Sequence, residues 1–213
     1  MKICVLCSTN GGILSKLLQD SFFFSKVSFI VSDRVCGVKN VADDFGKEFI
    51  VLSPKKGETF SDCFLNFVQK NEIDYVFAVY TKILKGELLE NYENKILNIH
   101  PSILPAFPGL SSFEKAVKAG VRFIGSTVHF IDKGVDTGPV IIQSSVPLDP
   151  VLSFDELRHK VFIDQCRIVL QAFKWIDEGR LRIQNGTVTI KNANFSSYRY
   201  SPNLDWSMLN EFS

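Results

Sequence analysis

The sequence has no long apolar run, and its charges almost cancel. Of 213 residues, 24 are Lys or Arg and 23 are Asp or Glu, a formal net charge of +1. Such a chain has no strong overall field that would attract nucleic acid or an anionic membrane surface. No apolar run reaches the roughly 20 residues that cross a bilayer, and Ser8 and Asn10 come too early for the apolar part of a signal peptide. We therefore expect a cytoplasmic protein that binds small molecules rather than nucleic acid or membrane.

The sequence also lacks a disulfide framework and a metal-binding spacing. Its five cysteines, at positions 4, 7, 36, 63 and 166, are odd in number, which suits free thiols in a reducing compartment. Cys4 and Cys7 have the C-x-x-C spacing, but no second pair exists, and on a strand their odd separation points the thiols to opposite faces. The three histidines show no zinc-binding spacing either. We expect no bound metal.

Repeats, low-complexity segments and linkers are missing as well, so residues 1–213 are expected to form one domain with a sizeable core. The first part alternates short apolar runs with amphipathic stretches. The pattern predicts strands at 2–6, 27–31, 49–52, 75–79 and 96–99, and helices at 13–19, 38–45, 60–69 and 84–91. Strands separated by helices imply a doubly wound, mostly parallel sheet, which binds ligands beyond the carboxyl ends of its strands.

The second part predicts a longer helix and an antiparallel element. A helix is expected at 113–119, then strands at 126–131 and 139–146 joined by a loop rich in Gly and Asp. A long helix at 154–177, stopped by Gly179, precedes a hairpin at 181–190 that turns at Asn185-Gly186. The fold class is therefore α/β and Rossmann-like, with a long C-terminal helix and a terminal hairpin.

Asn98 and His100 stand two residues apart at the end of an apolar strand, so their side chains face the same way. Pro101 and Pro105 restrict the chain beside them and favour a rigid loop. Asp136 lies on the Gly-rich connection, and a carboxylate against His100 would orient the ring and favour its protonated form. An amide and a protonated imidazole can stabilise an oxyanion, so the set suits acyl transfer.

Each of these residues also has a structural interpretation. A lone Asn or His at a strand end is usually a satisfied structural group, and only their combination in this loop favours catalysis. For His129, which alternates with its neighbours on a predicted strand, a hydrogen-bonded core position is the better interpretation. His159 has Arg158 and Lys160 as neighbours on a predicted helix and is expected in solvent.

Four segments carry a family resemblance: residues 98–105, 108–110, 125–130 and 136–141. Through them, and over nearly its whole length, the chain resembles the folate-dependent formyltransferase family typified by glycinamide ribonucleotide transformylase. The resemblance implies direct formyl transfer from 10-formyltetrahydrofolate to an amine, with Asn98, His100 and Asp136 as the catalytic set. It also implies that Thr127 matches a hydroxyl near an ordered water, and that residues 1–100 form the acceptor-binding half and 101–213 the folate-binding and C-terminal half.

The resemblance also implies the binding residues. The folate site would comprise Asn98 together with Lys82, Ile83, Leu84, Ile96, Ile131, Asp132, Lys133, Gly134 and Val135. Apolar walls and backbone hydrogen bonds suit a flat heteroaromatic ring, although ordinary core packing explains Ile83, Leu84 and Ile96 equally well. The acceptor site would comprise Asn10, Gly11, Gly12, Ile13, Pro101 and Gln165.

The acceptor site departs from the family pattern. Gly12 and Ile13 stand where the family carries a hydroxyl and an Asn, so two donors to a substrate phosphate are missing. Gly57 replaces an arginine, although Lys55 and Lys56 lie adjacent, and Gln165 replaces a glutamate.

Several functions therefore stay in competition. Glycinamide ribonucleotide is the preferred acceptor, and an amino group on a nucleotide-linked sugar is the alternative. A formyltetrahydrofolate hydrolase is disfavoured because that family carries a second His where Pro101 stands and an extra N-terminal domain. The intact catalytic set argues against a non-catalytic folate-binding relative, and the near-zero charge argues against methionyl-tRNA formylation. A monomer and a homodimer are both compatible with the sequence.

Overall fold

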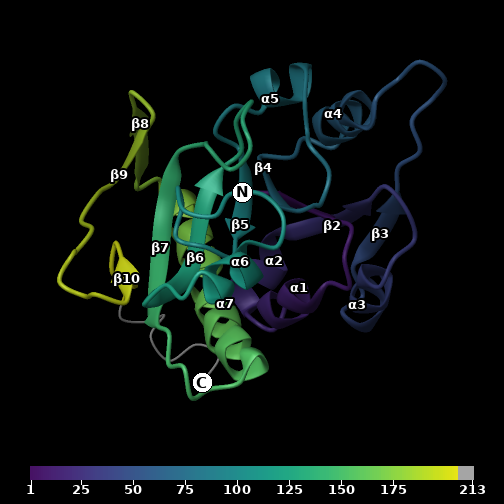
Figure 1. Cartoon of the computed structure of the whole chain (residues 1–213). Coiled ribbons are helices and arrows are strands. Elements are labelled where there is room, and N and C mark those ends of the chain that lie inside the picture. Colours follow the sequence, from purple (N-terminus) through teal and green to yellow (C-terminus); the bar gives the residue numbers. More distant parts are fainter. Residues whose placement is uncertain (206–213) are drawn as a thin grey trace. The chain divides into compact units, whose positions relative to one another are not determined.

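The computed structural model describes residues 1–205, whose helices and strands Figure 1 shows. The chain divides into two compact units. The first unit contains residues 1–98 and the short segment 131–133. The second contains residues 99–130 and those from 134 onward. The boundary falls within the strand that carries Asn98 and His100.

The first unit is built on parallel strands. They are β1 (Ile3–Cys7), β2 (Val27–Ser32), β3 (Glu48–Val51), β4 (Tyr75–Val79) and β5 (Ile96–His100), in the order β5-β4-β1-β2-β3. All five follow the predicted strands within two residues. The strand order reverses at β1, which pairs with β2 on one side and β4 on the other. Sheets of this kind usually bind ligands at the carboxyl ends where the order reverses. Here Ser8 follows β1 and Tyr80 follows β4 at that edge.

The helices of this unit are α1 (Gly12–Leu17), α2 (Ser21–Lys26), α3 (Val38–Asp44), α4 (Phe60–Lys70) and α5 (Glu87–Asn91). Helix α2 is absent from the predicted elements because its apolar residues, Phe22 to Phe24, are consecutive and show no helical period. Its cap is local: the Asp20 carboxylate accepts from the Phe23 backbone N–H at 2.8 Å. Helix α5 begins three residues later than predicted, since Gly86, at φ 70° and ψ −150°, cannot continue a helix backwards.

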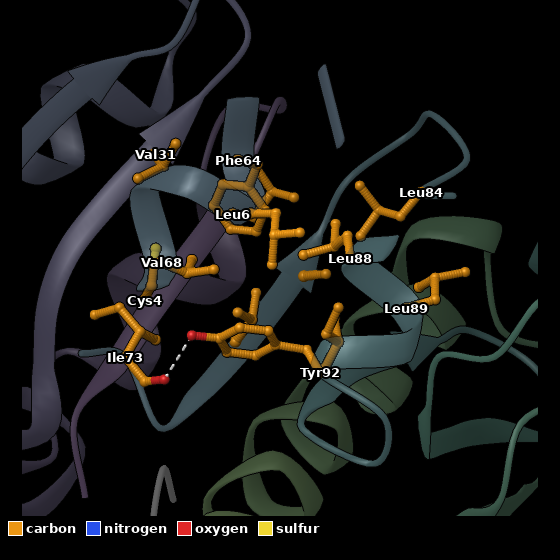
Figure 2. Packing of buried hydrophobic residues seen from close by; sticks show 14 residues of the cluster. Cys4, Leu6, Val31, Phe64, Val68, Ile73, Leu84, Leu88, Leu89 and Tyr92 are labelled. Atoms are coloured by element: carbon orange, nitrogen blue, oxygen red, sulfur yellow. Dashed lines mark hydrogen bonds between the residues drawn. The ribbon is translucent and has the colours of Figure 1, made fainter. Parts of the chain in front are cut away.

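The core of the first unit packs α4 and α5 against the central strands (Figure 2). Cys4 and Leu6 of β1 and Phe64 of α4 are fully buried in this cluster. The Tyr92 hydroxyl donates to the Ile73 carbonyl at 2.9 Å, so the polar end of this buried ring is satisfied. This packing fixes β1 and therefore the loop that follows it.

The second unit has antiparallel strands and the long helix. Strands β6 (Phe123–Phe130), β7 (Val140–Pro147) and β10 (Tyr200–Ser201) pair in the order β10-β7-β6, flanked in sequence by α6 (Ser112–Lys118), α7 (Phe154–Asp177) and the hairpin of β8 (Leu181–Gln184) and β9 (Thr187–Ile190). Strand β6 begins three residues before the predicted strand because Phe123 pairs with Pro147. The two-residue β10 is absent from the predicted elements.

Helix α7 has the predicted bounds. Ser153 and Glu156 form a capping box at its start, and Gly179, at φ 65°, follows its end. The helix is apolar over most of its buried face, but Asp164 is also fully buried. Its carboxylate accepts from Arg199 at 2.9 and 3.1 Å and from the Tyr200 hydroxyl at 2.6 Å. A polar clasp thus holds residues 199 and 200 to α7.

The predicted fold class is confirmed: an α/β, Rossmann-like fold with a mostly parallel strand set, a long C-terminal helix and a terminal hairpin. Among residues 1–205, no helix combines the length and apolarity needed to span a membrane.

Candidate active site

His100 ends β5 and is buried, with both ring nitrogens near acceptor oxygens. Nε2 lies 2.9 Å from the carbonyl oxygen of Phe107, and Nδ1 lies 3.3 Å from Oδ2 of Asp136. A carbonyl oxygen can only accept, so Nε2 carries a hydrogen. A neutral ring would then point its Nδ1 lone pair at a carboxylate. A proton on Nδ1 as well would let the ring donate to both oxygens at once.

Asp136 lies on the loop between β6 and β7 and faces three groups of the second unit. Besides His100, its Oδ2 accepts from the Gly109 backbone N–H at 2.7 Å, and its Oδ1 lies 3.7 Å from Nε2 of His129. The residue has φ of +54°, a left-handed conformation that Asp tolerates better than most side chains. The structure thus brings His100 and Asp136 side by side, in the arrangement that the sequence predicts.

His129 has features of both a core histidine and a residue of the candidate site. It is 2% exposed, and its Nδ1 lies 2.8 Å from the Phe130 carbonyl oxygen, as expected of a core histidine. Its other ring nitrogen nevertheless faces Asp136. Strand alternation around Val128 and Phe130 predicts the burial, but only the folded loop brings the carboxylate to it. His159, by contrast, is exposed as predicted.

Asn98 belongs to the first unit, where it pairs with Ala78 across β5 and β4. Its side-chain Nδ2 donates to the Ala78 carbonyl at 2.8 Å. That bond uses one of two amide N–H groups and fixes the plane of the amide. Asn98 and His100 remain two residues apart on one strand, as the sequence requires.

The residues predicted to bind folate fall into different environments. Leu84 and Ile96 are buried in the core of the first unit, and Ile131 packs against the same cluster (Figure 2 labels Leu84). Ile83 and Val135 are 72% and 52% exposed. Lys133 forms a surface ion pair with Glu90 at 3.0 Å. Asp132 and Lys133 belong to the first unit, whereas Gly134 and Val135 belong to the second.

Lys82, also a predicted folate residue, pairs with Asp33, which follows β2. Burial opposes ionisation of Asp33, but its hydrogen bond from Lys82 and the charges of Lys82 and Arg34 lower the pKa of the carboxyl below its ordinary value. Arg34 in turn donates to the Ser8 carbonyl at 2.9 Å. These contacts tie together the chain after three neighbouring strands, at the carboxyl edge of the first unit.

The predicted acceptor residues 10–13 follow β1 at this edge. Gly11 has φ of +74°, and a Cβ there would lie 2.9 Å from the Val38 side chain, so both backbone and space require glycine. The Val38 N–H donates to the Thr9 carbonyl at 3.1 Å. A Cβ on Gly12, the first residue of α1, would meet no atom within 4 Å. The space around Gly12 would therefore admit a side chain, and packing does not explain why glycine stands there.

The sequence of this chain was compared with protein families and with known proteins. The model of the family described as formyl transferase matches residues 1–172 of this chain. The chain belongs to the formyl transferase family. This formyl transferase is 31% identical over 196 residues to a phosphoribosylglycinamide formyltransferase of Haemophilus influenzae, an alignment that covers 86% of this chain and 91% of that protein.

Solved structures give the same relationship. Glycinamide ribonucleotide transformylase 1 of Symbiobacterium toebii is 32% identical, with a TM-score of 0.83 over 90% of this formyl transferase and 94% of that chain. A formyltetrahydrofolate deformylase of Pseudomonas syringae pv. tomato is only 20% identical, with a TM-score of 0.78 over 90% of this chain and 66% of that one. This second likeness shows a common fold alone.

The other predicted acceptor residues of this formyl transferase lie apart from the loop in sequence. Pro101 follows β5 and is half-buried, and Gln165 is half-buried on α7. Lys55, Lys56 and Gly57 are exposed, in the segment between β3 and α4. Within residues 1–205, no cluster of three or more His, Cys, Asp or Glu is arranged to hold a metal ion.

Proposed function

We propose that this formyl transferase moves a formyl group from 10-formyltetrahydrofolate to the amine of glycinamide ribonucleotide, a step of de novo purine synthesis. The relatives at 31% and 32% identity, which bear names for that activity, support the acceptor. The contact between His100 and Asp136 carries the chemical part of the proposal, because it orients the imidazole at the end of β5.

In the proposed reaction the neutral amine attacks the formyl carbon, and the new C–N bond turns the carbonyl into a tetrahedral oxyanion. Asn98 and the His100 imidazolium donate hydrogen bonds to that oxygen, where developing charge makes them most effective. The intermediate then collapses and breaks the bond to the folate nitrogen. Asp136 holds His100 and helps move the proton that the amine loses to the departing nitrogen.

We propose that residues 1–213 act as one catalytic domain. Residues 1–100 would supply the acceptor side through Asn10, Gly11, Gly12 and Ile13, and residues 101–213 would form the folate-binding and C-terminal half, with Pro101 and Gln165 completing the acceptor site. Folate would contact Lys82, Ile83, Leu84, Ile96 and Asn98, and residues 131–135.

A second acceptor has a specific observation in its favour. Gly12, Ile13 and Gly57 lack the polar groups that the family resemblance associates with a ribonucleotide phosphate. An amine on a nucleotide-linked sugar would place its phosphates differently and need those groups less. The donor and the catalytic set would stay the same.

The deciding experiment compares acceptors directly. Purified protein is assayed with 10-formyltetrahydrofolate and either glycinamide ribonucleotide or a panel of nucleotide-linked amino sugars. We expect turnover of glycinamide ribonucleotide, and His100→Ala should abolish transfer while folate binding persists. Turnover of an amino sugar without turnover of glycinamide ribonucleotide would overturn the preferred acceptor. Formate release without any amine would point to a hydrolase, and full activity of His100→Ala would refute the mechanism.

A further inference from the structure

The loop of residues 101–109 makes one contact with His100 and one with Asp136. Its Phe107 carbonyl oxygen lies 2.9 Å from Nε2 of His100, and its Gly109 N–H donates to Oδ2 of Asp136 at 2.7 Å. The orientation of the imidazole and the position of the carboxylate therefore both depend on where this loop sits. Whatever anchors the loop also sets the geometry of the pair.

Two side chains from neighbouring strands anchor the loop. Thr127 of β6 and Gln143 of β7 stand directly opposite each other in the antiparallel ladder. The Thr127 hydroxyl donates to the Ser102 carbonyl at 2.8 Å and accepts from the Leu104 N–H at 3.0 Å. Nε2 of Gln143 donates to the Leu104 carbonyl at 2.8 Å and to Oγ1 of Thr127 at 3.0 Å. Leu104 is thus held at both its backbone N–H and its carbonyl.

The hydrogen-bond partners of the Gln143 side chain fix the orientation of its amide group. The Thr127 hydroxyl has a single hydrogen, which it gives to Ser102, so it can only accept from Gln143. The Leu104 carbonyl can also only accept. Both hydrogens of the Gln143 amide are therefore committed, one to each oxygen. A glutamate of the same shape would bring a carboxylate against two acceptors and satisfy neither.

A hydrogen bond within the loop fixes its second half, residues 106 and 107. The Ser102 hydroxyl donates to the Ala106 carbonyl at 2.6 Å, next to the Phe107 carbonyl that faces His100. Ser102 also takes the Thr127 hydrogen bond through its own carbonyl. Contacts therefore connect Gln143 to His100 step by step. They run from Gln143 through Thr127 to Ser102, from Ser102 to Ala106, and from the adjacent Phe107 to His100.

We propose that Gln143 is a positioning residue for formyl transfer: it fixes the loop of residues 101–109 and thereby the relative placement of His100 and Asp136. The proposal rests on the proposed function for its effect on rate, because Gln143 acts on the pair through the loop rather than on the reacting atoms. Gln143 is absent from the site residues that the sequence predicts, since its position on a strand resembles that of an ordinary half-buried polar residue.

The test replaces Gln143 in two ways. Gln143→Glu keeps the shape but removes both donors, and Gln143→Met keeps the length without introducing a charge. Gln184→Glu, on the exposed position of β8, repeats the first change away from the loop. For both Gln143 variants we expect kcat to fall about 100-fold, the effect of a misplacement on the order of 1 Å, while KM changes little. Gln184→Glu should keep the wild-type kcat.

A second measurement separates positioning from turnover. The ring N–H resonances of His100, recorded by 15N NMR without substrate, report its contacts with Phe107 and Asp136. They should shift in both Gln143 variants and stay unchanged in Gln184→Glu. If Gln143→Glu does not fold, Gln143→Met decides. Folded variants with wild-type kcat, or with reduced kcat but unchanged His100 resonances, would overturn the proposal. If the wild-type protein turns over no acceptor while these resonances still shift, the proposed function fails and the positioning of His100 stands.

Discussion

Asp136 shows how single residues acquire their chemistry from contacts. Its carboxylate lies between two histidines and a backbone N–H, at 3.3, 3.7 and 2.7 Å respectively. The backbone N–H bond to Gly109 fixes one oxygen, which leaves the carboxylate little freedom to turn away from His100. A lone Asp on a surface loop would be a solvated charge. Here the Gly109 N–H holds it beside the imidazole of His100.

Gly12 gives a prediction at the same scale. Because a side chain there meets no atom within 4 Å, Gly12→Ser should be accepted without distortion. The new hydroxyl would stand where the family carries one and could donate to a substrate phosphate. Hydrogen bonds to charged groups contribute roughly 1.5–3 kcal/mol, so we expect KM for glycinamide ribonucleotide to fall about tenfold or more, measured by steady-state kinetics.

Gly12→Ala is the matched control, since it adds the Cβ without the hydroxyl and should leave KM within about twofold. Equal KM values for Gly12→Ser and wild type would show that no phosphate lies at this loop. They would then favour an acceptor whose phosphates bind elsewhere.

At the scale of elements, strand order decides which loops of the first unit lie next to each other. The sequence β5-β4-β1-β2-β3 places the ends of β1 and β4 beside each other, where the order reverses. Ser8 and Thr81 meet there, with their hydroxyl oxygens 3.3 Å apart. The short apolar runs predict the strands, but their order follows from right-handed crossovers that pack helices on the sheet.

Residues next to helix α7 in the sequence decide where it begins and ends. The Ser153 hydroxyl accepts from the Glu156 N–H, and the Glu156 carboxylate accepts from the Ser153 N–H at 2.8 Å. Ser153→Ala removes the first bond and weakens the box. We expect the free energy of unfolding to fall by about 1 kcal/mol, measured by urea denaturation at pH 7.

The control for this prediction is Ser21→Ala. Ser21 is exposed just inside α2, whose cap is Asp20, so its replacement should change stability by less than about 0.5 kcal/mol. Equal losses in the two variants would show that the capping box contributes nothing specific.

At the scale of the whole molecule, buried polar contacts tie the tail of the second unit to its long helix. In the second unit the tail returns to α7 and buries Asp164 completely, and the Arg199 guanidinium and the Tyr200 hydroxyl compensate its charge. Removal of one partner of such a buried charge costs more than the pair contributes, because the other is left unsatisfied. Single substitutions on either side of the clasp should therefore destabilise the fold.

This clasp predicts a pH dependence. Burial, followed by the neighbouring Asp164 carboxylate, raises the pKa of Tyr200 above its ordinary value of 10.0. The folded protein then keeps the phenol proton at a pH at which the unfolded chain has lost it. The resulting stability is complete below about pH 10 and is lost as pH rises above it. Tyr200→Phe should cost roughly 1–3 kcal/mol at pH 7, and the difference from wild type should shrink between pH 10 and 11.

Urea denaturation of both proteins across this range provides the measurement. Tyr198→Phe is the control, because Tyr198 is 99% exposed and its replacement should leave the pH profile unchanged. A difference between wild type and Tyr200→Phe that stays constant up to pH 11 would contradict the linkage to Asp164.

The sequence by itself determined the strands and most helices of this protein, because apolar periodicity, caps and glycine stops are local properties of the chain. It also predicted that Asp136 would meet His100. The tertiary structure alone decided what surrounds that pair. Helix α2 has no helical apolar period, and strand β10 has only two residues. The contacts of His129 and Gln143 join residues that are distant in sequence or on different strands. Such contacts depend on ladder register and loop geometry, which the composition of a segment does not specify.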